Sequence, residues 1–468
     1  MNPRRLRADL PFVRPAVLLS GGGALGAYQV GVLKVLRAVG LVPAIVSGAS
    51  VGAINAVAWV AQGFDAARLE RTWLRVGPSS IGFRWTTLLL RVAGVFLAAL
   101  AVIEVLLSLL GSTDSGVARL FFHRVPRVET ASWAYDSVAW LIVGTAGLLA
   151  ALLAPHAEAW LASATFAGDP ERWQRWSGRV LAVGMAAHLV TLAFGWPWPH
   201  RFSATILLVG GLAWLANRQG RSGHWLRRAL ARLLPESGGR GFWRGHARRR
   251  VLESLIADGD PSRLVSGSVR LLLAAVAVDT GRMCYFVNWS PAEASFRAAI
   301  DRALGEVELL ESPQDVVLAA SASSAIPLLF QPVRVHGRDF ADAGLFSSQV
   351  VRATVAAGAD SLLAVLMSPA VFPQVPSDGL HLFEVGSRLF EIGTWRDLRS
   401  ELGALPAPWS RDGDPASVCV VEPDTALPGG LLRFEPREAV ELVRRGEEDA
   451  WRALERAGWL EPAAACVP

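Results

Sequence analysis

A serine between two glycines is the first residue whose setting in this chain suggests chemistry. Gly48, Ser50 and Gly52 form a G-x-S-x-G pattern that follows a short β-branched run and precedes an apolar, helix-like stretch. Glycines at both positions allow a turn tight enough to expose the serine oxygen at the end of a strand. The pattern therefore predicts a nucleophilic serine on a sharp strand-to-helix turn.

A nucleophilic serine needs a base, and the sequence offers an aspartate more readily than a histidine. The histidines outside the apolar middle of the chain, His246, His336 and His381, do not lie in loops typical of a catalytic base. Asp342 ends a short hydrophobic run and is followed by small residues, which allow close backbone approach. A partly desolvated carboxylate within hydrogen-bond reach can deprotonate a serine. We therefore expect a Ser-Asp dyad, with Asp339 as the nearest competitor for the base.

A glycine-rich loop precedes the serine turn. Gly21, Gly23 and Gly26 have the G-x-G-x-x-G spacing that holds a pyrophosphate at a helix N-terminus in dinucleotide-binding domains. Those domains also need an acidic residue about 20 positions later to bind the ribose. No Asp or Glu occurs between Gly21 and Phe64, and the first acidic residue after the loop is Asp65. A dinucleotide-dependent oxidoreductase is therefore the weakest interpretation, and the loop is expected to hold a different negative charge.

Four blocks together resemble the patatin-like phospholipase family. They occur in the family's order: the glycine loop 21–33, the serine turn 48–55, the block 322–333 with the pattern Ser-x-Ala-x-Pro-x-x-Phe-x-Pro, and Asp342-Ala343-Gly344. The resemblance covers residues 14–80 and 246–455. Three departures are Leu25 in place of a frequent arginine, Ala343 in place of a glycine, and Ser347-Ser348-Gln349 in place of Asn-x-Pro.

The resemblance implies a role for each matching residue. These are the nucleophile Ser50, the base Asp342, the oxyanion-hole residues Gly21, Gly22, Gly23 and Ala24, and the turn glycines Gly48 and Gly52. It further implies cleavage of acyl esters of glycerophospholipids or related lipids through an acyl-enzyme, without a metal or cofactor. The same dyad could instead transfer the acyl group to another lipid, or the site could be disabled in a membrane scaffold.

The elements that must position these residues alternate between strands and helices. Residues 14–77 are expected to form strand, glycine loop, helix, strand, turn and helix, which predicts an α/β fold with a mainly parallel sheet and helices on both faces. The resemblance implies a patatin-like three-layer α/β/α sandwich. Further elements are predicted from hydrophobic pattern: strands at 269–278, 283–289, 361–367 and 418–421, and helices at 315–325 and 436–457.

The middle of the chain is strongly apolar. Its four apolar stretches are 86–110, 137–154, 180–196 and 203–216. The second has no charged residue and would form a helix of roughly 27 Å, close to the thickness of a bilayer core. Arginines crowd the region Arg218–Arg250 that follows, and positive charge beside a span marks the cytoplasmic side. We expect an all-helical insertion with up to four transmembrane segments; a buried helical subdomain with a solvated basic face is the alternative.

These patterns predict three regions: 1–84 and 246–468 as the two halves of the catalytic domain, and 85–245 as the insertion. A hydrophobic fraction of 52% and a mean hydropathy of +0.34 favour a membrane protein. We expect a multi-pass protein of the cell membrane, in a bacterium the inner membrane, with a cytoplasmic catalytic domain. The expected partners are a lipid substrate and the membrane, with anionic head groups near Arg218–Arg250, and no nucleic acid.

Overall fold

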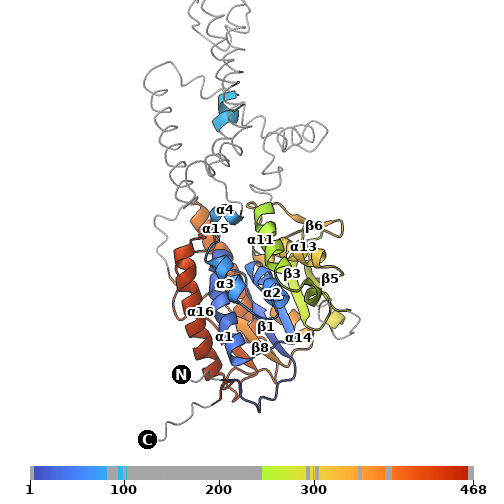
Figure 1. Cartoon of the computed structure of the whole chain (residues 1–468), viewed down its shortest axis with the longest axis vertical. Helices are drawn as coiled ribbons and strands as arrows, with labels where there is room; N and C mark the ends of the chain where they lie inside the picture. The colour runs from blue at the N-terminus through green and yellow to red at the C-terminus, as the bar shows by residue number, and fades with distance from the viewer. Residues whose placement is uncertain are drawn as a thin grey trace, which may run out of the picture. The chain divides into compact units, whose positions relative to one another are not determined.

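The computed structural model describes residues 5–81, 93–98, 102, 145, 149, 245–290, 296–298, 300, 305–345, 350–374 and 382–461. The chain divides into two compact units, one made of residues 1–82 and 240–468 and the other of residues 83–239. The elements labelled in Figure 1 belong to the first unit.

A mainly parallel sheet forms the centre of the first unit. Its order is β5-β4-β3-β2-β1-β8-β9, and the β6–β7 hairpin joins it through β7 and β3. Neighbours pair in parallel except at β3–β4, β3–β7 and β6–β7. The strands are β1 Pro15–Leu19, β2 Ile45–Ala49, β3 Arg270–Ala277, β4 Met283–Val287, β5 Gly305–Leu309, β6 Val333–Val335, β7 Arg338–Ala341, β8 Ser361–Val365 and β9 Val418–Val421.

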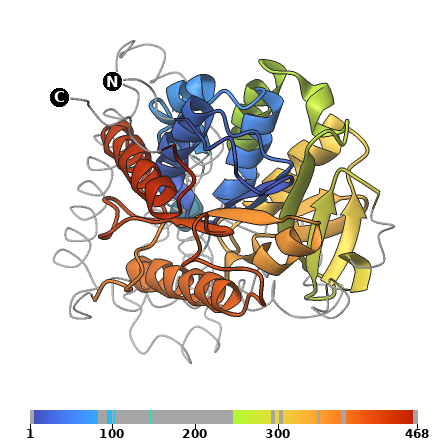
Figure 2. The same ribbon diagram turned by 90° about the horizontal axis from the view of Figure 1, so that it is seen from below.

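Helices cover both faces of the sheet (Figure 2). One face packs against α14 and α15, in a core that includes Leu18, Val350 and Leu398. On the other face lie α1, α2 and α16, and α1 packs along α16. The helices are α1 Gly26–Val39, α2 Val51–Ala61, α3 Ala67–Trp73, α4 Pro78–Ile81, α11 His246–Ala257, α13 Pro313–Ser323, α14 Val350–Ala356, α15 Leu382–Gly403 and α16 Pro436–Arg456, with short 3-10 helices η1 Gly23–Leu25, η2 Pro261–Leu264 and η3 Ala343–Leu345.

The hydrophobic patterns explain why these elements form. The central strands are buried on both faces, so their sequences are near-continuous apolar runs, as expected for parallel strands covered by helices. The α/β fold and the mainly parallel sheet predicted from the sequence are confirmed. The predicted strands at 269–278, 283–289, 361–367 and 418–421 correspond to β3, β4, β8 and β9, and the predicted helices at 315–325 and 436–457 to α13 and α16.

Strand register brings the two predicted catalytic residues to the same level of the sheet. Ala49 pairs with Ala274 in the parallel β2–β3 ladder, so the next residue, Ser50, is level with Ala275. Ala341 pairs with Val276 in the antiparallel β3–β7 ladder, so the residue after it is also level with Ala275. Because Val276 pairs with Met283 of β4 on its other edge, β7 lies on the same edge of β3 as β2. Ser50 at the end of β2 and Asp342 at the end of β7 therefore meet beside Ala275, although 292 positions separate them in the chain.

The predicted transmembrane stretches lie almost wholly outside the described residues. Of the unit 83–239, the structure describes only residues 93–98, 102, 145 and 149. Among the residues that are described, none of the helices combines the length and the apolar character needed to cross a bilayer. The membrane insertion therefore remains a prediction from the sequence.

Candidate active site

Ser50 lies on a strained turn between β2 and α2. Its backbone has φ 54°, a region that residues with a side chain rarely adopt. The flanking glycines are required by space: a Cβ at Gly48 would overlap the backbone of Gly52, and a Cβ at Gly52 would overlap the carbonyl oxygen of Leu19. The structure thus places Gly48 and Gly52 on the tight strand-to-helix turn that the sequence predicts.

Asp342 follows β7 and directly contacts the serine. Ser50 Oγ donates a 2.5 Å hydrogen bond to Asp342 Oδ2, and the Gly344 backbone N–H donates to Asp342 Oδ1 at 2.8 Å. The Asp342 backbone N–H donates to the carbonyl oxygen of Ala325 at 3.0 Å. Both dyad residues are buried, with exposed fractions of 3% for Ser50 and 0% for Asp342. The competing aspartate, Asp339, instead pairs with Arg334.

The electrostatic setting of Asp342 makes its carboxylate a stronger base than usual. Burial raises the pKa of Asp342 from 3.8 to about 6, because removal from water disfavours the charged form. The hydrogen bonds from Ser50 and the Gly344 N–H, together with the positive charge of Arg248, lower the pKa and oppose this effect. At neutral pH the carboxylate is therefore mainly ionised and able to accept a proton.

The glycine loop lies against the serine turn. A Cβ at Gly21 would be 3.1 Å from the Cβ of Ser50, which shows how closely the loop approaches it. No acceptor in the described part of the chain is bonded to the backbone N–H groups of Gly22 and Gly23. These two amides are available to a ligand next to the serine. Their position after β1 and before α1 is that of an oxyanion-binding loop.

Ala24 differs from the expectation for this loop. Its backbone N–H donates a 2.8 Å hydrogen bond to the carbonyl oxygen of Leu431, which belongs to the segment between β9 and α16. An amide already bonded to a buried carbonyl cannot also stabilise an oxyanion without losing that bond. Gly22 and Gly23 are therefore better oxyanion donors than Ala24.

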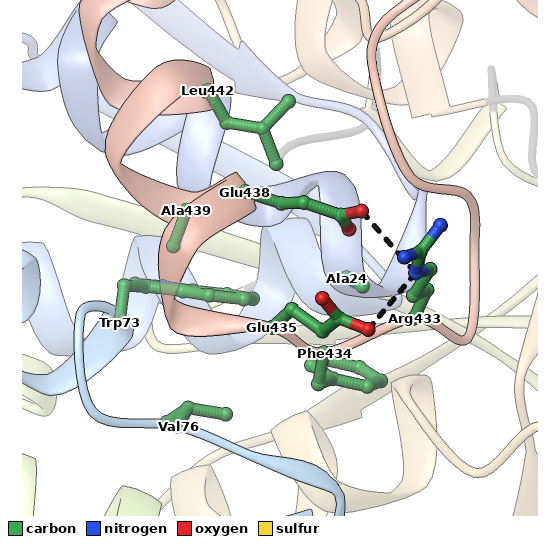
Figure 3. Close-up of a pocket in the computed structure, with 9 residues that line it drawn as sticks. All are labelled: Ala24, Trp73, Val76, Arg433, Phe434, Glu435, Glu438, Ala439 and Leu442. Atoms are coloured by element: carbon green, nitrogen blue, oxygen red, sulfur yellow. Dashed lines mark hydrogen bonds and ion pairs between the residues drawn. The ribbon is translucent and has the colours of Figure 1, made fainter.

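A small cavity borders the glycine loop at Ala24, and neither Ser50 nor Asp342 lines it. It is bordered by Ala24, Trp73 and Phe434, and by Arg433, which is paired with Glu435 and Glu438 (Figure 3). Its volume of about 10 Å³ corresponds to about one water molecule. The cavity is too small for an acyl chain.

A network of buried polar side chains connects the glycine loop to the surrounding helices. The Asn55 side-chain amide donates to Gln29 Oε1 at 2.8 Å and to the Gly26 carbonyl oxygen at 3.0 Å. Trp73 Nε1 donates to Asn55 Oδ1 at 2.9 Å, and Gln29 donates to the Ser20 carbonyl oxygen at 2.8 Å. Because every bond joins α1, α2, α3 or the end of β1, the network fixes the loop relative to the serine turn.

Two residues near the dyad were missed by the sequence interpretation. Ser323 Oγ accepts the Ser50 backbone N–H at 2.9 Å and donates to the Ala274 carbonyl oxygen at 2.6 Å. The sequence did contain an indication of this residue, because Ser323 is the first residue of the Ser-x-Ala-x-Pro pattern. Arg248 was grouped with a solvated basic flank but is buried, with an exposed fraction of 8%. Nothing in its local sequence distinguishes it from the neighbouring arginines.

The remaining sequence candidates lie elsewhere or outside the described residues. His336 is in the β6–β7 turn and lies 3.3 Å from Glu308 and 3.5 Å from Asp315. His381 and residues 347–349, one of the three departures from the family pattern, are not among the described residues. Within the ranges that the structure covers, no group of three or more potential metal ligands is found.

Comparison with known proteins identifies the family of the chain. The family model of patatin-like phospholipases matches residues 17–355. Among solved structures, VipD from Legionella pneumophila is 14% identical with a TM-score of 0.33, over 97% of this chain and 70% of that one. No curated protein matches the chain. Because the family match spans well over half of the sequence, the chain belongs to the patatin-like phospholipase family, and it is an enzyme of the lipid acyl hydrolase class.

Proposed function

We propose that the chain hydrolyses acyl esters of glycerophospholipids or related lipids through Ser50 and Asp342. The observation that carries the proposal is the 2.5 Å hydrogen bond from Ser50 Oγ to the buried carboxylate of Asp342. A serine on a strained turn, bonded to a base of raised pKa, has the arrangement needed for nucleophilic catalysis.

The first half of the proposed reaction forms an acyl-enzyme. Ser50 Oγ attacks the ester carbonyl carbon while its proton moves to Asp342 Oδ2. The carbonyl oxygen becomes an oxyanion, which the Gly22 and Gly23 amides stabilise; one such donor is typically worth about 3 kcal/mol. The intermediate then collapses: the ester C–O bond breaks, and the leaving alkoxide takes the proton from Asp342.

The second half releases the fatty acid. A water molecule attacks the acyl-enzyme, Asp342 accepts its proton, and the same amides hold the second oxyanion. Collapse breaks the bond to Ser50 Oγ, which regains a proton from Asp342, so the free acid leaves and the enzyme is restored. Replacing water by a lipid alcohol would give acyl transfer instead. The proposed steps use only groups of the chain, the substrate and water.

The test uses a fluorophosphonate probe together with hydrolysis of p-nitrophenyl butyrate and of phospholipid vesicles by the full chain. We expect labelling and release of free acid, with both lost in Ser50→Ala. The matched control is Ser262→Ala, because Ser262 Oγ also donates a 2.5 Å hydrogen bond to an aspartate, Asp260, but on the surface. Absence of labelling in the wild type would support the disabled scaffold. Transfer of the acyl group to an added lipid alcohol without free acid would support the transacylase.

We also propose that the apolar stretches within residues 83–239 anchor the enzyme in the cell membrane with its catalytic unit in the cytoplasm. The support is their length and hydropathy, and the arginines between residues 218 and 250. Carbonate extraction and protease protection on sealed vesicles test this. Extraction of the chain by carbonate, or cleavage between residues 218 and 250 only from the outside of the cell, contradicts it.

A further inference from the structure

Arg248 is a charged side chain in an unusual place. It lies in the first turn of α11, the first described helix after the unit 83–239. Among the described residues, Arg248 is the only arginine that is buried. Neighbouring Arg249 pairs with Glu253 and is partly exposed, while Arg250 is exposed. Burying a guanidinium is costly unless its donors are satisfied, so Arg248 must have specific partners.

The two hydrogen-bond acceptors of Arg248 both lie at the end of α13, and its Nε has no hydrogen-bond partner among the described residues. Its Nη2 donates to the Ser321 carbonyl oxygen at 2.9 Å, and its Nη1 donates to the Ser324 carbonyl oxygen. Its guanidinium carbon lies 4.2 Å from the centre of the Phe330 ring. The last carbonyl groups of a helix carry a partial negative charge, and an aromatic face attracts a cation, so the segment is matched to a guanidinium.

The same segment holds the backbones of both dyad residues. Ser323 Oγ accepts the backbone N–H of Ser50, and the Ala325 carbonyl oxygen accepts the backbone N–H of Asp342. Arg248 donates hydrogen bonds to residues 321 and 324, and residues 323 and 325 accept the backbone N–H groups of the dyad. The two sets of residues alternate along one short segment. A shift of this segment would therefore move the serine and the aspartate together.

Arg248 also acts on the dyad through its charge. Its positive charge lowers the pKa of Asp342 and opposes the effect of burial. The other groups that act on the carboxyl group are uncharged: the Ser50 hydroxyl at the start of α2 and the Gly344 N–H in η3. Among the described residues, Arg248 is thus the charged side chain that favours the ionised, proton-accepting form of the base.

We propose that Arg248 is a positioning residue for the dyad: its guanidinium binds the carbonyl oxygens of Ser321 and Ser324 and so fixes segment 321–325, which holds the backbones of Ser50 and Asp342. This inference rests on the proposed function, because it assigns Arg248 to the same reaction. The sequence placed Arg248 in the basic region expected to lie near anionic head groups, whereas we now assign it a role beside the dyad.

The test compares Arg248→Gln and Arg248→Lys with the control Arg263→Gln in the full chain. Arg263 undergoes the same chemical change but lies in η2, where its side chain is 50% exposed and pairs with Asp260. The readout is hydrolysis of p-nitrophenyl butyrate, with kcat and KM measured from about pH 5 to about pH 9. Thermal unfolding of each variant is recorded in parallel.

We expect Arg248→Gln to lower kcat at neutral pH about tenfold or more, with KM changed by no more than about twofold. Its acid limb should move to higher pH, because the carboxylate loses a positive charge that favours ionisation. Arg248→Lys should keep the acid limb of the wild type and recover only part of kcat, since an ammonium cannot make the two-pronged contact. Arg263→Gln should match the wild type in both.

Three outcomes would overturn the inference. The first is that Arg248→Gln keeps the kcat of the wild type. The second is that Arg248→Gln loses kcat equally at every pH while its acid limb stays at the wild-type pH, as expected for a residue that only stabilises the fold. If Arg248→Gln does not fold, Arg248→Lys decides, and wild-type kcat in that variant counts against the positioning role. Activity that persists in Ser50→Ala would contradict the proposed function itself, whereas active wild type with unaffected Arg248 variants contradicts only the inference.

Discussion

Ser50 with Asp342, and Ser262 with Asp260, are two serine–aspartate pairs in which the hydroxyl oxygen lies 2.5 Å from a carboxylate oxygen. The first pair is buried, and burial raises the pKa of Asp342 to about 6. The second is exposed, and its hydrogen bonds with Ser262 lower the pKa of Asp260. A hydrogen bond from a hydroxyl therefore does not by itself make a carboxylate a stronger base. Removal of the carboxylate from water raises its pKa and does so.

The backbones of the two serines differ as well. Ser50 has φ 54° and lies beside a loop whose Gly22 and Gly23 amides are available to a ligand. Ser262 lies in the short helix η2, where its N–H donates to Asp260, the N-cap residue. The surface pair is thus a helix cap, and the buried pair stands beside donors that could stabilise negative charge.

The largest expected difference between the pairs is in turnover. Asp342→Asn should lower kcat/KM by about 10⁴-fold, because an amide cannot accept the serine proton. Asp260→Asn should leave kcat/KM within about twofold, since surface changes away from the site have small effects. Steady-state hydrolysis of p-nitrophenyl butyrate measures both. Similar losses in the two variants would mean that burial does not set the pairs apart.

The donors beside Ser50 give the next largest effect. Gly23→Ala should lower kcat about 10²–10³-fold, because φ is 54° there and the added Cβ would overlap the Leu431 carbonyl oxygen, displacing the amides. Gly40→Ala is the matched control, with φ 83° and nothing within 4 Å of the added Cβ. It should cost about 1–2 kcal/mol of stability and leave kcat unchanged. Equal turnover in the two variants would exclude the loop from catalysis.

The raised pKa of Asp342 predicts the pH dependence of the reaction. The carboxylate must be ionised to accept a proton, and its protonated fraction grows as the pH falls through about 6. Below that point kcat/KM should fall about tenfold per pH unit. Rates of hydrolysis and of fluorophosphonate labelling should show the same acid limb. Activity that stays constant down to about pH 4, near the pKa of an exposed aspartate, would contradict the buried base.

The surface pair should affect stability alone, and only slightly. Asp260→Ala removes the N-cap of η2, so we expect a small fall in Tm at neutral pH with no change in kcat. The pKa of Asp260 is lowered in the fold, so its stabilisation is present above the unfolded value of 3.8 and is lost as the pH falls through the folded value. Calorimetry across this range should show the difference in Tm disappearing at acidic pH; a difference that grows there would reverse the assignment.

Much of the fold could be predicted because its determinants are local. Apolar runs predicted β3, β4, β8 and β9, and the helical period predicted α16. The two glycines around Ser50 predicted the turn, since only small residues fit there. The available amides of Gly22 and Gly23, by contrast, could not be separated from that of Ala24. Its acceptor, the Leu431 carbonyl, lies about 400 residues further along the chain.

The sequence by itself determined the α/β order of the elements, the serine turn, the aspartate that follows β7, and the family resemblance. Only the tertiary structure decided that Asp342, not Asp339, meets Ser50, because β2 and β7 end at the same level of one edge of β3, in a register that no local pattern encodes. It also decided that Arg248 is buried while Arg250 is exposed. The physical reason is that burial and its effect on charge depend on residues distant in the sequence, here the carbonyl groups at the end of α13.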